Sequence, residues 1–153
     1  MKNAGFDART DTLIAQLQAA TYLNDGLPGS EEISVVKGPW DAGTPDPQHF
    51  SIHVSRMGHP EFDYGVAGDP VIVTQQVAVA CVTSYPAGRE EMEQYLGFVA
   101  ANTVRALLAC RQVAGEAGWH SGVITESDAQ TFRSQTNTTY EVEVFSFETK
   151  YEV

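Results

Sequence analysis

Basic side chains are scarce in this sequence of 153 residues, which holds 9 Lys and Arg against 20 Asp and Glu. The formal net charge is therefore -11 at pH 7. Proteins that bind nucleic acid through its phosphates need clustered Lys and Arg, so the composition argues against that class. Two interpretations of the surplus acid stay open: plain solubility, or an acidic wall that repels DNA passing beside it.

Long apolar runs and cysteines are also in short supply. No stretch approaches the roughly 20 apolar residues needed to cross a bilayer, and no apolar run follows Lys2. We therefore expect neither a membrane segment nor a secretory signal. Cys81 and Cys110 are too few for a disulfide scaffold, and each lies in an apolar pattern, which favours buried free thiols over a bridge. Asn137 opens a glycosylation sequon, which we attribute to chance because no secretory signal accompanies it.

Motifs for catalysis, metal binding and nucleotide binding are missing from the sequence. His49 and His53 are spaced four apart, but on a strand they would lie about 13 Å from each other, too far to hold one ion. There is no H-E-x-x-H, C-x-x-C, G-x-S-x-G or Gly-rich phosphate loop. We therefore expect no catalytic residues, no metal-binding or cofactor-binding residues, and no enzyme activity.

Glu141 and Glu143 form an acidic pair at a spacing that some enzymes use. On a strand the two side chains would point the same way about 7 Å apart, which is within the range of glycosidase carboxylates. Regular alternation on an exposed sheet face explains the pair equally well. We favour that second interpretation.

Two stretches carry helical periodicity. Residues 8–22 repeat apolar side chains at helical spacing, and a second helix is expected to begin at Arg89 and stop at Gly115. The second helix carries one continuous apolar stripe, which consists of Met92, Leu96, Val99, Thr103, Ala106, Cys110 and Val113. Each stripe predicts a helix with one buried face.

Alternating patterns predict several strands. Short strands are expected at residues 33–37 and 50–55, and a long one at residues 71–84. At about 3.3 Å per residue the long strand would extend roughly 45 Å, so it needs a bend or a partner. Residues 40–48 and 57–69 are rich in glycine and proline, and we expect both to be loops.

The C-terminal third is typical of a β-hairpin, with arms in residues 123–133 and 140–151 and a turn at residues 135–137. The apolar residues of the last strand change face along the strand: Tyr140, Val142 and Val144 lie on one face, then Phe145 and Phe147 on the other. A β-bulge near Val144 explains this change, and so does a strand that a neighbouring subunit half covers.

The order of these elements predicts an α+β fold. Consecutive strands with short connections favour a mainly antiparallel sheet with two helices packed on one face and a C-terminal β-hairpin. With 42% hydrophobic residues the chain can bury a sizeable core, so we expect residues 1–153 to form a single domain.

Several large side chains point to assembly. Aromatic residues in loops form either small satellite cores or contacts with a partner, and the long strand and the last strand both look under-satisfied in a single copy. Together these features predict an oligomer. The candidate interface residues are Trp40, Met57, Phe62, Tyr64, Phe145 and Phe147.

The layout resembles the tail terminator (tail-completion) proteins of long-tailed bacteriophages. Residues 69–77, in the long valine-rich strand, lead to residues 99–108 of the helix, and residues 140–148 form the closing aromatic strand. These segments carry the resemblance, which covers nearly the whole chain as an order of elements rather than as a diagnostic motif.

The resemblance implies a structural virion protein without catalysis, located in the tail or neck and assembled in the host cytoplasm. It implies a hexameric ring that caps the tail tube, stops its polymerisation and docks to the head-side connector or stopper. DNA would pass through the ring without specific binding, and Glu141 and Glu143 are candidates for an acidic lumen.

Two other functions stay open at this point. The first is another neck protein, a stopper or an adaptor. The second is a small-molecule-binding or catalytic α+β domain with a pocket between sheet and helix, which would involve His53 or His120.

Overall fold

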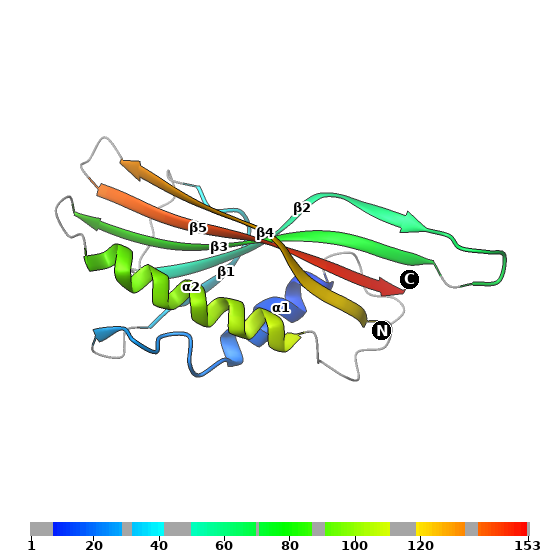
Figure 1. The fold of residues 1–153 in the computed structure, drawn as a ribbon, viewed down its shortest axis with the longest axis horizontal. Coiled ribbons are helices and arrows are strands. Elements are labelled where there is room, and N and C mark those ends of the chain that lie inside the picture. Colours follow the sequence, from blue (N-terminus) through cyan, green and yellow to red (C-terminus); the bar gives the residue numbers. More distant parts are fainter. Residues whose placement is uncertain are drawn as a thin grey trace.

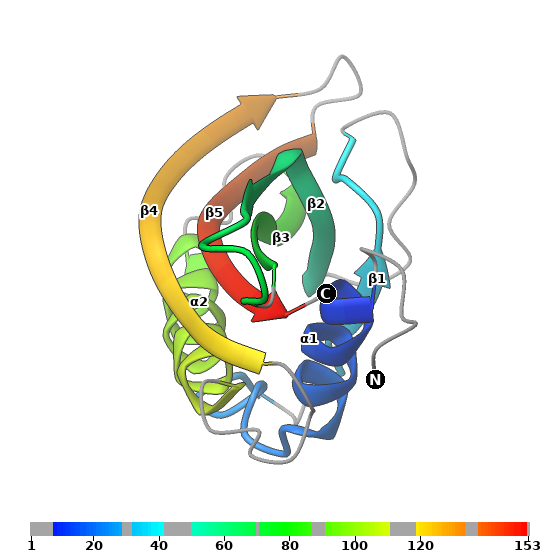
Figure 2. The same cartoon turned by 90° about the vertical axis from the view of Figure 1, so that its right-hand side faces the viewer.

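A computed structural model describes residues 8–28, 32–41, 50–69, 71–86, 91–110, 119–133 and 138–152. In these ranges a five-stranded sheet of order β1-β2-β3-β5-β4 carries two helices on one face (Figure 1). The elements are α1 (Ala8–Ala19), β1 (Ser34–Lys37), β2 (Phe50–Asp63), β3 (Ile72–Pro86), α2 (Glu91–Cys110), β4 (Trp119–Arg133) and β5 (Thr138–Glu152). Seen end-on, β1 and β4 are the two edges of a curved sheet, and α1 and α2 lie side by side (Figure 2).

The pairing of the strands confirms the predicted α+β fold. Strands β2, β3, β5 and β4 are antiparallel to their neighbours, β4 and β5 form the C-terminal hairpin, and only the short β1 runs parallel to β2. Between the described strands the chain supplies partners on both sides of β3, which pairs with β5 along its whole length. The sequence predicted that so long a strand needs a bend or a partner, and β2 and β5 are these partners.

Both helices bury the stripes that the sequence predicts. In α1 the side chains of Leu13 and Leu17 are fully buried, and the stripe of α2 is buried from Met92 to Ala106. The helix α1 ends three residues earlier than expected, and in its last turn the amide of Ala20 donates to the carbonyls of both Gln16 and Leu17. The side chain of Cys110 and all of Val113 lie outside the described structure.

Asn102 of α2 holds the turns that follow α1. The Nδ2 group of Asn102 donates to the backbone carbonyls of Leu23, at 3.1 Å, and of Asp25, at 3.0 Å. The guanidinium of Arg105 also lies 3.9 Å from the ring centroid of Tyr22. These contacts fix the end of α1 against α2 and thereby position the segment that leads to β1.

Most of the main core lies between the sheet and the helices. We use the name main core for the buried side chains that join α1 and α2 to the helix-facing side of the sheet: Leu13, Leu17, Leu23, Leu27, Phe50, Ile52, Val54, Val77, Val79, Cys81, Met92, Leu96, Val99, Ala100, Ala106, Leu107, Phe145 and Phe147. Alternate residues of β3 take part because successive side chains of a strand point to opposite faces. Neither helix in the described ranges is long and apolar enough to cross a membrane.

The expectation of a loop at residues 57–69 is wrong for its first half, because β2 continues to Asp63. Between Met57 and Glu61 the register shifts: four steps along β2 match two steps along β3. Gly58, with φ of 69°, allows the backbone to bulge there, and pairing then resumes. Glycine and proline in this stretch therefore mark an irregularity inside a strand rather than its end.

The expected β-bulge near Val144 does not occur in β5 itself, which pairs with β3 in unbroken register. The nearest irregularity lies in β4, where the pairing shifts between Ile124 and Glu126, opposite Phe147 and Ser146. The change of face instead reflects burial on both sides of the sheet. Phe145 and Phe147 belong to the main core, whereas Val142 packs on the opposite side. There it forms a second core with Ala80 and Val82, against which Trp40, Tyr140 and Val144 also pack.

Candidate functional site

The hairpin of β2 and β3 is the most exposed apolar feature that the structure describes. Its end reaches beyond both helices (Figure 1). Met57, Phe62, Tyr64 and Val66 are 41%, 44%, 69% and 74% exposed, although large apolar side chains are usually buried. The rings of Phe62 and Tyr64 stack with their centroids 6.3 Å apart and 24° between their planes. An exposed apolar cluster of this kind is typical of a contact surface.

We use the name hairpin tip for residues 61–69, whose turn is held by its own hydrogen bonds. The Oδ1 atom of Asp63 accepts from the amide of Gly65 at 3.0 Å, and the Oδ2 atom of Asp69 accepts from the amide of Val66 at 3.1 Å. The amide of Asp69 also donates to the carbonyl of Val66 at 2.9 Å. Gly65 has a φ of 56°, which favours glycine. The exposed side chains are therefore presented by a preorganised turn.

The base of the hairpin is anchored by a buried amide. Gln75 is fully buried on β3, and its Nε2 group donates to the carbonyl of Met57 at 3.3 Å, where the bulge begins. The hydroxyl of Thr149 on β5 donates to the carbonyl of Gln75 at 3.1 Å. The Oε1 atom of Gln75 has no partner within the described ranges. This arrangement ties the bulge of β2 to β3 and β5.

Of the candidate interface residues, Met57, Phe62 and Tyr64 are brought together on this hairpin, and the remaining three are not. Phe147 is fully buried and Phe145 is 8% exposed, both in the main core. Their assignment to a contact surface is corrected, because a side chain that its own chain buries offers no area to a partner.

Trp40 lies apart from the hairpin and is half-buried over the second core. Its ring centroid is 5.8 Å from that of Tyr140, with 56° between the planes. The position corresponds to a satellite core, one of the two alternatives for an aromatic residue in a loop. Val66, in contrast, is a contact candidate that the sequence interpretation missed. An apolar side chain between two glycines in an acidic segment would have been the signal for it.

Glu141 and Glu143 do not lie on an exposed sheet face. Glu143 is paired in register with Cys81 of the main core, so its side chain leaves the sheet on the side of the helices, where both glutamates are half-buried. Burial, and then the negative charge of Glu93, raise the pKa of Glu143. The Oε2 atom of Glu141 accepts a hydrogen bond from the hydroxyl of Thr131 at 2.7 Å.

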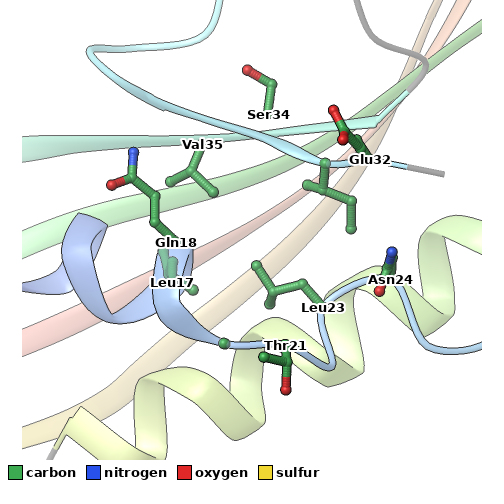
Figure 3. Close-up of a pocket in the computed structure, with 10 residues that line it drawn as sticks. Leu17, Gln18, Thr21, Leu23, Asn24, Glu32, Ser34 and Val35 are labelled. Carbon is green, nitrogen blue, oxygen red and sulfur yellow. The ribbon is translucent and has the colours of Figure 1, made fainter. Parts of the chain in front are cut away.

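A groove with a volume of about 520 Å³ lies between the end of α1 and β1 (Figure 3). Its lining mixes an apolar set with a polar set: Leu17, Ala20, Leu23, Ile33 and Val35, then Gln18, Thr21, Asn24, Glu32 and Ser34. Glu32 is the ionisable residue among them. The accessible surface of the groove is more polar than apolar, and Leu17 and Leu23 of the apolar set are buried.

His53, one of the two histidines considered for a pocket, does not line this groove. His53 lies on β2, where its Nε2 atom is 2.9 Å from the hydroxyl of Ser51, and the side chain of His120 is outside the described structure. No group of three or more possible metal ligands occurs in the residues that the structure describes.

Comparisons with known proteins give a match in structure and none in sequence. No family model and no curated protein matches the chain. A chain from the virion of a native gene transfer agent (GTA) particle superimposes on it with a TM-score of 0.58. The two share a fold. Their sequences are 14% identical, and the match covers 94% of each chain, so the likeness extends over the whole arrangement of helices and strands.

Proposed function

We propose that this chain is a structural virion protein of a phage-type particle, and specifically a tail terminator. The observation that carries the proposal is the fold shared over 94% of both chains with a chain of a GTA virion. The order of elements in the sequence supports the finer assignment, because it resembles the tail terminators of long-tailed phages.

The proposed action is geometric. Copies of the chain form a hexameric ring, one face of which complements the last ring of the tail tube and stops further polymerisation. The opposite face docks to the head-side connector or stopper, and a central hole admits DNA. Such an action needs rigid, preorganised surfaces rather than catalysis, and the hairpin tip, held by Asp63 and Asp69, is a surface of that kind.

The surplus acid has a role in this proposal. A ring built from chains of net charge -11 has a negative lumen if part of that charge faces inward, and a negative lumen repels the phosphates of passing DNA. Glu141 and Glu143 remain the lumen candidates. Glu93 joins them, because its charge acts on Glu143 from α2. DNA would then move through the ring without specific binding.

The test is to polymerise the tail tube protein of the same particle with and without this chain, and to measure tube lengths by electron microscopy. We expect shorter tubes, each ending in an extra ring that shows sixfold symmetry in averaged images. Chain that has been heat-denatured and cleared serves as the control. Tubes of unchanged length and ends without added density would contradict the terminator assignment.

The purified chain can also be used to distinguish the terminator from the two alternative functions. A stopper or an adaptor would bind the purified connector of the head and ignore tube ends. A small-molecule-binding domain is favoured by one observation, the groove of about 520 Å³, which is in the size range of ligand pockets. A metabolite screen by thermal shift would reveal it, and the tubes would then be unaffected.

A further inference from the structure

We propose that the groove between the end of α1 and β1 binds an alkylammonium group, which is an alkyl chain that ends in a protonated amine. Free polyamines and the side chain of lysine both carry this group. The inference goes beyond the proposed function and does not depend on it.

The charges around the groove favour a cation. Glu32 on its wall is exposed, and no Lys or Arg is found among the described residues that line it. The basic residue of β1 is Lys37, whose Nζ atom lies 2.8 Å from Oδ1 of Asp11 in the first turn of α1, at the other end of the helix. A positive ligand is also attracted by the whole chain, since its net charge is -11.

The end of α1 adds partial negative charge to the same space. Gln18, in the last turn of the helix, and Thr21, just after it, both line the groove. The last carbonyl groups of a helix have no partner within it, so the C-terminal end of a helix attracts cations. In Figure 3 Gln18 lies on the side of α1 and Glu32 on the segment that leads into β1, so negative groups act on the groove from both walls.

The apolar part of the lining suits the alkyl chain of such a ligand. Ala20, Ile33 and Val35 are half-buried, so part of each of these side chains is accessible. Leu17 and Leu23 are buried and offer little surface. A lysine-like chain lays its methylene groups on apolar surface of this kind and keeps its charged end among polar groups.

The polar part of the lining can satisfy the amine. A protonated primary amine has three N–H donors and no acceptor, so it needs oxygen atoms around it. Four uncharged side chains of the groove carry such an oxygen: Gln18, Thr21, Asn24 and Ser34. The volume of about 520 Å³ is in the range of ligand pockets, so a free polyamine fits as well as a single side chain.

The test is a titration of the folded chain with pentylamine at pH 7, followed by NMR of the backbone amides. We expect saturable shifts that are largest at the lining residues, with a Kd on the order of 1–10 mM. Pentanol, which has the same chain without the charge, should bind at least about tenfold more weakly. Ethylamine, which has the charge on a shorter chain, should also bind about tenfold more weakly.

Variants of two exposed glutamates locate the site. Glu32→Gln should weaken the binding of pentylamine about tenfold and leave the binding of pentanol unchanged. Glu91→Gln removes an equal charge from α2, outside the groove, and should leave both unchanged. Since both side chains are exposed, neither substitution should unfold the chain, and urea midpoints check this.

Two further ligands distinguish the sources of the amine. Spermidine represents a free polyamine, and an uncharged peptide with one central lysine represents a segment of a neighbouring protein. Tighter binding of spermidine assigns the site to a free polyamine, and tighter binding of the peptide assigns it to a lysine side chain. Either result supports the inference, provided that Glu32→Gln weakens the binding.

Three outcomes would overturn the inference: pentanol that binds as tightly as pentylamine, shifts that spread over the acidic surface without saturation, or an unchanged affinity of the Glu32→Gln chain. The capping of tubes is measured separately. Its result bears on the terminator function alone and leaves the assignment of this groove untouched.

Discussion

The thiol of Cys81 on β3 donates a hydrogen bond to the hydroxyl of Thr103 on α2, with 3.4 Å between sulfur and oxygen. The same hydroxyl donates to the carbonyl of Val99 at 2.8 Å, so a buried polar pair connects sheet and helix inside the main core. Both side chains are fully buried. Thr103 lies on an otherwise apolar stripe, and this pair of bonds explains how its hydroxyl is tolerated there.

We predict that Cys81 resists thiol reagents in the folded protein. Burial raises the pKa of Cys81 to about 12, against an ordinary value of 9.0, so at pH 8 the reactive thiolate is almost absent. In a Cys110→Ser background, labelling by Ellman's reagent should be slower than for the unfolded chain by a factor of about 10³ or more. Adding Val66→Cys to that background provides an exposed thiol for comparison. Fast labelling of Cys81 under native conditions would contradict the prediction.

The same thiol predicts a loss of stability in alkali. The unfolded chain releases the proton near pH 9, whereas the folded chain keeps it up to about pH 12. Since the unfolded state then binds fewer protons, the free energy of unfolding should fall as the pH rises through this window. The fall can be measured as the change in the urea midpoint between pH 8 and pH 10.5. The two chains to compare are the Cys110→Ser chain and the same chain with Cys81→Ala. The fall should be smaller in the chain without the thiol.

Phe147 and Val66 should respond in opposite ways to truncation. Phe147→Ala leaves a cavity in the main core and should lower the free energy of unfolding by about 3–5 kcal/mol. Val66→Ala removes a side chain that is mostly in water and should change it by less than about 0.5 kcal/mol. Urea unfolding followed by circular dichroism gives both values. A cost below about 1 kcal/mol for Phe147→Ala would mean that Phe147 is not a core residue.

The sequence predicts those parts of the fold in which one face is buried throughout. The alternation of Phe50, Ile52 and Val54 indicates which side of the strand faces the helices. The apolar stripe of α2, at helical spacing, indicates which side of the helix faces the sheet. The extension of β2 was not predictable in this way, because Gly58 and Pro60 are break signals. Pairing with β3, the other arm of the same hairpin, continues on both sides of the irregularity and keeps the strand together.

For the candidate site, the local sequence pattern identifies large apolar side chains in unusual positions. It does not show whether the folded chain exposes or buries them. Phe62 and Tyr64 in an acidic stretch do turn out to be exposed. Phe145 and Phe147 are buried because their side of the sheet faces the helices. Val142, on the opposite side, is buried in a cluster that includes Trp40, which no local pattern connects with β5. The groove beside β1 could not be predicted from the sequence either, since α1 and β1 come together only in the folded chain.

Glu143 should destabilise the folded protein at neutral pH. Burial, followed by the charge of Glu93, raises the pKa of Glu143 above its ordinary value of 4.5, so the unfolded chain loses this proton first as the pH rises. The contribution of Glu143 to the free energy of unfolding is therefore highest below about pH 4.5. It falls as the pH rises towards the pKa of Glu143 in the folded protein. Glu143→Gln should therefore raise the urea midpoint at pH 7 relative to the natural chain, and the difference should vanish near pH 4.

Glu141→Gln is the matched control, since it removes an equal charge from the same face of β5. Its carboxylate accepts a hydrogen bond from Thr131, so the substitution should leave the midpoint at pH 7 unchanged or lower it. A lower midpoint at pH 7 for Glu143→Gln would show that its charge is compensated in the folded state, contrary to the prediction.

Gly26 and Phe98 should be coupled through a close approach of the turn after α1 to α2. Gly26 has a φ of 91°, and a Cβ atom added there would lie 2.9 Å from Cγ of the Phe98 ring. Gly26→Ala should lower the free energy of unfolding by about 2 kcal/mol, because the strained φ and the clash both contribute. Gly68→Ala, with a φ of 97° and no atom within 4 Å of the added Cβ, isolates the backbone contribution at about 1 kcal/mol. In a Phe98→Ala background the cost of Gly26→Ala should fall to that smaller value, and an unchanged cost would mean that the ring moves aside and the two residues are independent.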